Sequence, residues 1–206
     1  MAKMKSSLTN MVMILVGFSL VIAALLAWLN HITEAPIAAK AELALANGIK
    51  EVMASNDLKV TANDTIRQAI DEKEVVFVVH QVVDKSKKSI GAAVESTALG
   101  FGGDLKILVG FAPDGTILGY TVLQHSETPG LGAKAQTWFQ KSGKGNIIGM
   151  NPAQGNLVVK KDGGQVDAIT ASTITSRAFL KAINRAYNAY IERSLNQTTT
   201  AEKGGK

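Results

Sequence analysis

The segment Asp167–Ser176 (Asp-Ala-Ile-Thr-Ala-Ser-Thr-Ile-Thr-Ser) brings hydroxyl side chains to the point where a helical pattern begins. A helix start exposes backbone N–H groups that have no partner inside the helix, and these groups together with Ser and Thr hydroxyls suit a phosphate. The alternative is an ordinary helix start capped by Ser or Thr, which is common. The segment therefore predicts a phosphate-binding junction only if a second feature supports it.

Two loops earlier in the chain are candidates for that second feature. Residues His125–Gly132 (His-Ser-Glu-Thr-Pro-Gly-Leu-Gly) follow a predicted strand and contain a rigid Pro-Gly turn. Loops that leave a sheet in this way often carry binding residues. Residues Gly100–Gly103 (Gly-Phe-Gly-Gly) place three glycines around one aromatic side chain. This loop is either a flexible strand connection or a backbone that comes close to a flat ligand, and the sequence leaves both open.

The composition excludes several kinds of chemistry. The chain of 206 residues has no Cys, which excludes disulfides, thiolate catalysis, iron–sulfur ligation and Cys-based zinc sites. His80 lies inside a predicted strand, where a structural role is the more common one. The sequence shows no convincing set of general acid, base and nucleophile, so no catalytic residue and no metal ligand is predicted. The net charge of +5 is spread along the chain without a basic helix, which argues against nucleic acid as a partner.

The N-terminal residues 11–29 (MVMILVGFSLVIAALLAWL) form an uncharged apolar run. As a helix with a rise of about 1.5 Å per residue, the run spans most of a hydrocarbon core of roughly 30 Å. A cleaved signal peptide is the alternative, but it would be shorter and would end at small residues rather than at Trp28. Lys3 and Lys5 precede the run, so the positive-inside rule predicts a cytoplasmic N-terminus. We therefore expect a single-pass anchor in the inner (cytoplasmic) membrane, with the remainder on the periplasmic, extracytoplasmic side.

The next part of the chain predicts a stalk and then a small sheet. Residues 35–55 are rich in Ala, Leu, Glu and Lys and predict a helix, with a break at Asn47-Gly48 left open. Asn63-Asp64-Thr65 predicts a helix cap before residues 66–70. β-branched residues dominate 75–83, which predicts a strand covered on both faces. Further strands are predicted at 91–98, 105–112 and 116–124, with Pro113-Asp114-Gly115 as a hairpin turn.

The C-terminal part predicts a return to the sheet and a final helix. A short helix is expected at 133–141, a hairpin of 156–161 with 165–169, and a helix at 175–194 whose apolar spacing lets one face pack on the sheet. The predicted fold class is α+β, with one N-terminal transmembrane helix followed by an exported domain in which helices pack on a mainly antiparallel sheet. The predicted parts are a cytoplasmic N-terminus (1–10), a transmembrane anchor (11–29), a helical stalk (30–60), a binding domain (61–195) and a disordered tail (196–206).

The order of these features resembles a known family. The chain contains the anchor, the Gly-Phe-Gly-Gly turn, the Pro-Asp-Gly hairpin, His-x-Glu-Thr-Pro-Gly-Leu-Gly, and Asp-x-x-Thr-x-x-Thr-x-Thr-Ser at the start of the last helix. From about residue 10 to residue 195 this order resembles the G subunit of the Rnf-type ion-translocating electron-transport complex. A close relative of that subunit is the C subunit of the sodium-pumping NADH:quinone oxidoreductase. The last two motifs carry the resemblance together, and neither is specific alone.

The resemblance implies FMN joined covalently through its phosphate to a threonine hydroxyl. A separate flavin transferase makes this bond and recognises Asp-x-x-(Ser/Thr)-Gly-Ala-Thr. By position, Thr173 is the attachment residue, whereas Ala171 and Ser172 replace the commoner Gly and Ala. Because Ala resists a positive φ that Gly accepts, we expect less efficient attachment rather than a different attachment residue. The implied FMN-binding residues are Asp167, Thr170, Ser172, Thr173, Ile174 and Thr175 at the junction, and Glu127, Thr128, Leu131 and Gly132 in the preceding loop.

The function implied by the resemblance is electron relay within a membrane complex. That complex would couple electron transfer between ferredoxin and NAD to ion translocation, and its other subunits, the flavin transferase and the membrane would be the partners of this chain. Whether the chain by itself counts as an enzyme is left open. The alternatives are the quinone-reducing relative's C subunit, a stand-alone extracytoplasmic FMN reductase module, and a non-redox binding domain whose motif is not modified.

Overall fold

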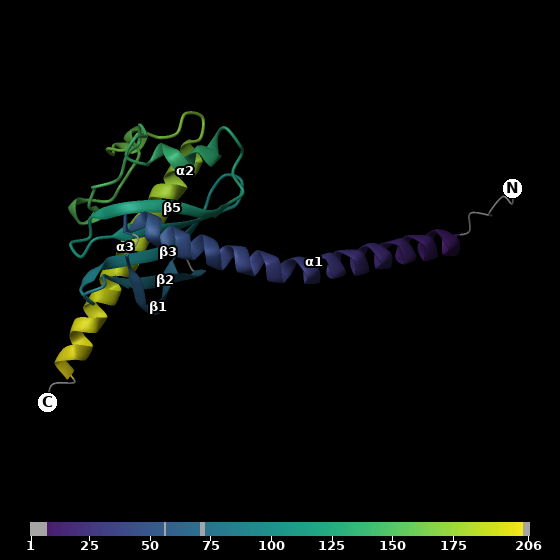
Figure 1. Cartoon of the computed structure of the whole chain (residues 1–206). Coiled ribbons are helices and arrows are strands. Elements are labelled where there is room, and N and C mark those ends of the chain that lie inside the picture. Colours follow the sequence, from purple (N-terminus) through teal and green to yellow (C-terminus); the bar gives the residue numbers. More distant parts are fainter. Residues whose placement is uncertain (1–7, 56, 71–72, 204–206) are drawn as a thin grey trace. The chain divides into compact units, whose positions relative to one another are not determined.

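The computed structural model describes residues 8–55, 57–70 and 73–203, and it divides into two units, residues 1–43 and 44–206 (Figure 1). The fold class is α+β as predicted, with one long apolar N-terminal helix followed by an antiparallel five-stranded sheet and further helices. Part of the predicted cytoplasmic N-terminus, residues 1–7, lies outside the described residues. The boundary between these two units, at residues 43 and 44, falls within the sequence of the predicted stalk.

The first unit consists of most of helix α1 (Leu8–Val52), which contains the whole predicted anchor. The helix is long and apolar enough to cross a membrane, and its apolar side chains between Met11 and Leu29 are exposed. Pro36 lies within the helix without ending it, so the predicted anchor and the predicted stalk as far as Val52 lie in one continuous helix, whereas the last residues of the predicted stalk, from Lys59, begin strand β1. The helix also continues through Asn47-Gly48, so the possible break there does not occur. Its last turns belong to the second unit, and there Ile49 and Val52 are buried in a cluster of apolar side chains, which stabilises the helix up to its end.

Strand β1 (Lys59–Ile70) shows that the prediction of a helix over residues 66–70 was wrong. Exposed and half-buried residues alternate along the whole strand, which is the period of an extended chain rather than of a helix. The supposed cap residues Asn63 and Asp64 pair with His80 and Val79 of the next strand. Pairing with a long β-branched strand therefore outweighed the local capping signal.

The second unit is organised around an antiparallel sheet with the strand order β1-β2-β3-β4-β5. The other strands are β2 (Lys73–Val83), β3 (Ser89–Leu99), β4 (Asp104–Phe111) and β5 (Ile117–His125). All four confirm predicted strands to within a few residues. The turn at Pro113-Asp114-Gly115 is also confirmed, with Gly115 at φ 85 and its N–H donating to Ala112 O at 2.9 Å.

Helix α3 (Thr173–Lys203) packs on one face of the sheet, mainly against β3. Its apolar side chains join inward-facing residues of the strands in one core, where Phe179 lies 4.3 Å from Phe139 and 4.8 Å from Tyr120 between ring centroids. The backbone is helical through Lys203, so the prediction that the helix ends near Ser194 was short. Helical backbone thus covers part of the predicted disordered tail 196–206, since Gln, Ala, Glu and Lys allow the helix to continue. Residues 204–206 lie outside the described residues.

The opposite face of the sheet carries the last turns of α1 and a buried polar network. Gly110 and Gly119 are paired, and a Cβ on either would lie 2.5 Å or 2.8 Å from Val52 O, so the two glycines let the helix end approach the strands. Beside them, buried His80 contacts Asn63 Oδ1 at 2.8 Å and Glu95 Oε1 at 2.8 Å. This arrangement gives His80 a structural role in joining three strands.

The segment between β5 and α3 contains short helical turns rather than the predicted hairpin of 156–161 with 165–169. These residues form only one parallel bridge among those described, between Val159 and Val166. A 3₁₀ turn occupies residues 160–162, where the expected first strand ends, so the two arms do not form an antiparallel ladder. The expected helix at 133–141 is a short helical segment. The turns and helix are η1 (Gly132–Lys134), α2 (Ala135–Trp138), η2 (Pro152–Gln154) and η3 (Lys160–Asp162).

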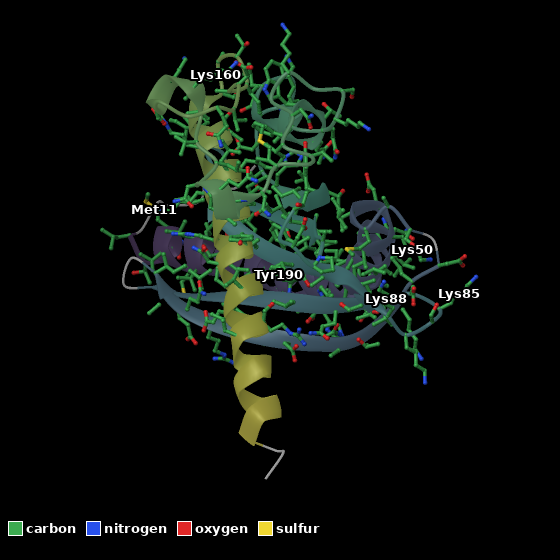
Figure 2. All side chains as sticks on the ribbon, turned by 90° about the vertical axis from the view of Figure 1, so that its left-hand side faces the viewer. Met11, Lys50, Lys85, Lys88, Lys160 and Tyr190 are labelled. Carbon is green, nitrogen blue, oxygen red and sulfur yellow. The ribbon has the colours of Figure 1, made fainter. Side chains whose placement is uncertain are left out.

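Basic side chains lie on several elements of this unit. Figure 2 shows Lys85 and Lys88 at the turn between β2 and β3, and Lys160 at the distant end of the domain. The turn itself is ordered by Asp84, whose Oδ1 accepts hydrogen bonds from the N–H groups of Ser86 and Lys88. Positive charge is thus distributed over the domain rather than gathered on one helix.

Candidate functional site

The two sequence motifs and the Gly-Phe-Gly-Gly turn meet at one cavity of about 410 Å³. This volume falls in the range of small-molecule binding sites, about 300–1,000 Å³. Three segments far apart in sequence contribute to it: the β3–β4 turn, the loop after β5 and the start of α3. The lining residues are Phe101, Glu127, Thr128, Leu131, Gly132, Ala171, Ser172, Thr173, Ile174 and Thr175.

Large apolar side chains line the cavity and remain open to solvent. Phe101, Leu131 and Ile174 are 71%, 41% and 53% exposed, and each comes from a different segment. Exposed large apolar side chains that gather around a concave site commonly mark a binding surface. The arrangement suits a flat, largely apolar ring. The sequence left open whether the Gly100–Gly103 loop only connects two strands or approaches a ligand. Because Phe101 of this loop lines the cavity, the structure favours the second alternative.

Glu127 joins the three segments by its carboxylate, which is almost fully buried. Its Oε1 accepts a hydrogen bond from Phe101 N at 2.8 Å and a longer one from Gly102 N at 3.4 Å. Its Oε2 accepts from the Thr175 hydroxyl at 2.9 Å. Hydrogen bonds to an ionised acceptor are stronger than neutral ones. Glu127 therefore cross-links the three segments by hydrogen bonds and fixes the shape of the cavity.

Glycines surround this carboxylate because no side chain fits beside it. A Cβ at Gly100 would lie 2.0 Å from Glu127 Oε1, and a Cβ at Gly132 would lie 2.4 Å from Glu127 Oε2. A Cβ at Gly102 would lie 2.2 Å from the carbonyl oxygen of Ser126. These three glycines thus serve the close packing of the two loops around Glu127.

The start of α3 is held by two serines of the junction. The N–H of Ser172 donates to Ile169 O at 3.0 Å, and the hydroxyl of Ser176 donates to Ser172 O at 2.9 Å. The Ser176 hydroxyl also accepts from Ile169 N at 2.9 Å. With this turn fixed, the N–H groups of the first helical residues, from Thr173 to Thr175, have no acceptor within the helix.

Thr173 is the first residue of α3 and lines the cavity. Its Oγ1 accepts a hydrogen bond from Lys161 Nζ at 3.4 Å. Lys161 lies on the η3 turn, twelve residues before Thr173. Sequence reasoning missed Lys161, because a single Lys in a polar turn carries no pattern that distinguishes it from a solvent-exposed residue.

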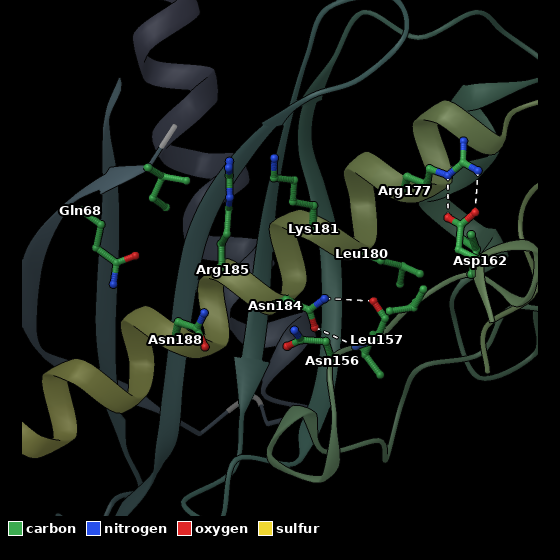
Figure 3. A pocket seen from close by; sticks show the side chains of 13 residues that line it. Gln68, Asn156, Leu157, Asp162, Arg177, Leu180, Lys181, Asn184, Arg185 and Asn188 are labelled. Atoms are coloured by element: carbon green, nitrogen blue, oxygen red, sulfur yellow. Dashed lines mark hydrogen bonds and ion pairs between the residues drawn. The ribbon is translucent and has the colours of Figure 1, made fainter. Parts of the chain in front are cut away.

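Ion pairs hold the η3 turn on both sides of Lys161. Asp162 accepts two hydrogen bonds of 2.7 Å from Arg177, one turn after Thr173 on α3 (Figure 3). These bonds hold the pKa of Asp162 below its ordinary value. On the other side, Lys160 Nζ lies 2.7 Å from Asp167 Oδ2. The two residues that hold the η3 turn are therefore Asp167, in the junction motif, and Arg177, in the helix that follows it.

Ala171 adopts a left-handed backbone conformation with φ 60. The attachment motif implied by the resemblance has Gly at this position, and a residue other than glycine has a steric cost there of about 1 kcal/mol. The departure from the family motif therefore falls on a position with positive φ. The chain still makes the turn, as the hydrogen bonds of Ser172 and Ser176 show.

The structure brings together eight of the ten predicted residues as lining of the cavity and leaves two outside it. Thr170 is exposed and is not among the lining residues, and Asp167 accepts a hydrogen bond from Lys160. The carbonyl oxygen of Asp167 also accepts a hydrogen bond from Trp138 Nε1 at 2.8 Å. Asp167 thus connects the junction to Lys160 and Trp138 and does not line the cavity. Among the described residues, no group of three or more His, Cys, Asp or Glu side chains could hold a metal ion.

The fold and the site define this chain as a flavoprotein that contains an FMN-binding domain. A family model described as FMN-binding domain matches residues 100–188, a range that contains all three segments of the cavity. A glycine cradle, an apolar rim and a helix start with hydroxyls fit a flat ring that carries a phosphate.

Curated relatives specify the family further. The chain is 35% identical over 179 residues to the G subunit of the ion-translocating oxidoreductase complex of Cereibacter sphaeroides, covering 84% of this chain and 80% of the relative. It is 36% identical over 185 residues to the protein of the same name from Methanosarcina acetivorans, covering 87% of this chain and 92% of the relative. The chain belongs to the family of G subunits of the ion-translocating oxidoreductase (Rnf) complex.

A solved structure is also similar to this chain. The crystal structure of NqrC from Shewanella oneidensis matches with a TM-score of 0.44 and 23% sequence identity, covering 61% of this chain and 63% of that chain.

Proposed function

We propose that this chain is a membrane-anchored flavoprotein that relays electrons, with FMN attached through its phosphate to Thr173. The observation that carries this proposal is the position of Thr173. It is the first residue of α3 and lines the same cavity as Phe101, Leu131 and Ile174, whose side chains are exposed. The attachment point for a phosphate and the surface for a ring are therefore within one site.

The phosphate side of the proposed site is favourable for a negative charge. The free N–H groups and macrodipole at the start of α3 stabilise an anion by about 0.3–1 kcal/mol at an exposed position. Lys161 adds a cation beside Thr173 Oγ1. The hydroxyl of Thr175 is already engaged by Glu127, so it serves the shape of the cavity rather than the phosphate.

The ring side of the proposed site consists of apolar side chains and backbone. Leu131 and Ile174 can pack on a ring. The N–H groups of Leu131 and Ala133 both donate to Thr128 O at 3.2 Å, so the N–H of Gly132 between them is the one proposed as a donor to the edge of the ring. When bound, FMN supplies the electron chemistry, and the protein binds and orients it and tunes its potential through hydrogen bonds, charge and exposure. The carboxylate of Glu127 lines this cavity and accepts hydrogen bonds from Phe101 N and from the Thr175 hydroxyl.

We further propose that the chain works within a larger complex, as the names of its relatives indicate. The relatives are subunits of an ion-translocating oxidoreductase complex, and the resemblance implies electron transfer between ferredoxin and NAD. The apolar part of α1 is proposed as a single-pass inner-membrane anchor, with the N-terminus cytoplasmic and the FMN domain periplasmic. The proposed partners are the other subunits and a flavin transferase.

The fluorescence of flavin that stays bound to the denatured protein tests this proposal directly. The full chain is coexpressed with a flavin transferase of the family, denatured and run on a gel, and its mass is measured. We expect a fluorescent band and an added mass of FMN less one water in the wild type and in Thr173→Ser, which keeps a hydroxyl. Thr173→Ala should fold and lack both. Retained covalent flavin in Thr173→Ala, or its absence from the wild type, would overturn the proposed attachment.

A further inference from the structure

We propose that Lys161 is a positioning residue for flavin attachment, holding the flavin phosphate against Thr173 while the bond forms and neutralising it afterwards. This inference rests on the proposed attachment of FMN at Thr173. It adds a residue outside the attachment motif, on a different segment of the chain. It follows from contacts of the η3 turn, the junction and the first turns of α3.

The first argument is the contact itself. The Lys161 ammonium lies 3.4 Å from Thr173 Oγ1 and, among the described residues, is the one hydrogen-bond partner of that hydroxyl. A phosphorus atom bonded to Oγ1 would by connectivity lie beside this ammonium. Charge-assisted hydrogen bonds between an ammonium and a phosphate are roughly twice as strong as neutral ones. The contact therefore places the cation where the new negative charge must appear.

The second argument is that the η3 turn is fixed in place around Lys161. Lys160 is tied to Asp167, and Asp162 is tied to Arg177 by two bonds that Figure 3 shows. The N–H of Lys160 also donates to Val166 O at 2.8 Å. The residues on either side of Lys161 are thus anchored to the segment that bears Thr173. The turn thus holds the backbone of Lys161 at a position from which its exposed side chain reaches the Thr173 hydroxyl.

The third argument is the charge balance of this turn. The flanking charges cancel in pairs, since Lys160 faces Asp167 and Asp162 faces Arg177. Among the ion pairs of the described residues, none includes Lys161. One positive charge therefore remains beside Thr173, and a phosphodiester carries one negative charge. Lys161 also interacts electrostatically with Asp162, but the two short hydrogen bonds of that carboxylate go to Arg177.

The contact also constrains the chemistry of attachment. Lys161 donates to Oγ1, so a protonated Lys161 cannot take the proton of the Thr173 hydroxyl. The balanced step joins Thr173 Oγ1 to phosphorus, breaks the phosphoanhydride bond of an activated flavin nucleotide and releases the nucleoside monophosphate. The hydroxyl proton goes to a base of the transferase. Lys161 thus binds the reacting phosphate, and the partner protein supplies the base.

The test measures the rate of attachment to the full chain in detergent, with purified transferase and flavin dinucleotide as donor. Lys161→Gln removes the cation, Lys161→Arg keeps it, and Lys88→Gln makes the same charge change on an exposed turn remote from η3 (Figure 2). We expect the kcat/KM for the acceptor protein to fall about three- to tenfold in Lys161→Gln. Lys161→Arg should restore most of the rate, and Lys88→Gln should leave it unchanged.

A structural role of Lys161 predicts a different result. If Lys161 only supported the fold, the salt dependence of the rate would be the same in Lys161→Gln and the wild type, whereas a phosphate contact makes the wild-type rate more sensitive to salt. Equal rates and equal salt dependence in both proteins would overturn the inference while fluorescence of the wild type still supports attachment at Thr173. An unmodified wild type would instead overturn the proposed function.

Discussion

Replacing Glu127 by Ala removes the carboxylate that joins the three segments of the cavity, and we expect a large loss of stability. Two donors lose a short bond, Phe101 N at 2.8 Å and the Thr175 hydroxyl at 2.9 Å, and Gly102 N loses a longer one. A buried donor left without an acceptor costs about 1–3 kcal/mol. Because water can enter from the cavity and satisfy part of this need, we expect a total loss of about 2–4 kcal/mol.

The conservative variant Glu127→Gln separates the hydrogen bonds from the charge. Its amide oxygen can still accept from Phe101 N, and the Thr175 hydroxyl can rotate to accept from the amide NH2 group. We therefore expect Glu127→Gln to lose only about 1 kcal/mol, since the bonds become neutral ones. The difference in stability between Glu127→Ala and Glu127→Gln measures the contribution of these hydrogen bonds rather than a general effect of substituting a residue in the loop.

Thermal and urea unfolding of the full chain in detergent, purified without flavin, measure this difference by circular dichroism. For a unit of this size, about 1 kcal/mol shifts the melting temperature by roughly 2–4 °C, so Glu127→Ala should melt about 5–15 °C lower. Hydrogen exchange should also become faster at the amides of Phe101 and Gly102. If Glu127→Ala lowers the free energy of unfolding by less than about 0.5 kcal/mol and leaves exchange at these amides unchanged, Glu127 does not hold the three segments together.

Two further predictions concern the backbone of the junction and the buried polar network. Ala171→Gly should stabilise the domain by about 0.5–1 kcal/mol and increase the rate of flavin attachment, because Gly accepts the φ of 60 without a steric penalty; unchanged unfolding in urea would contradict this. Burial disfavours the charged form of Glu95, but hydrogen bonds from His80 and Lys106 outweigh it and keep the pKa below the ordinary 4.5. This lowered pKa contributes stability above pH 4.5 that is lost as the pH falls below it. Urea midpoints should therefore fall less steeply toward acid in Glu95→Gln than in the wild type, and equal slopes would refute the assignment.

The strands that the sequence predicted correctly are those with strong β-branched patterns and clear turns. Residues 75–83 and the Pro113-Asp114-Gly115 turn carry their own structural signal, and the structure confirms both. Strand β1 carries none of comparable strength, since polar residues fill its exposed positions and resemble a helix cap. Its identity depends on pairing with β2 along nearly its whole length. Such a non-local cause is absent from any short window of sequence.

The same reasoning explains which parts of the site were predictable. The junction and the 125–132 loop have motifs, and eight of the ten residues predicted from them line the cavity. The sequence does not assign Phe101 to the site, because three glycines around an aromatic residue also fit a plain strand connection. Lys161 has no motif at all, because its proximity to Thr173 depends on a turn held by Asp167 and Arg177.

The position of the site follows from the antiparallel order of the sheet. The β3–β4 turn and the end of β5 lie at the same edge, because Leu105 of β4 pairs with His125 of β5. The loop after β5 therefore begins beside the Gly100–Gly103 turn, and Glu127 reaches two of its amides. The Thr175 hydroxyl then fixes α3 to the same carboxylate. One buried acidic side chain thus holds the start of α3, and with it Thr173, against a cavity that the sheet has already positioned.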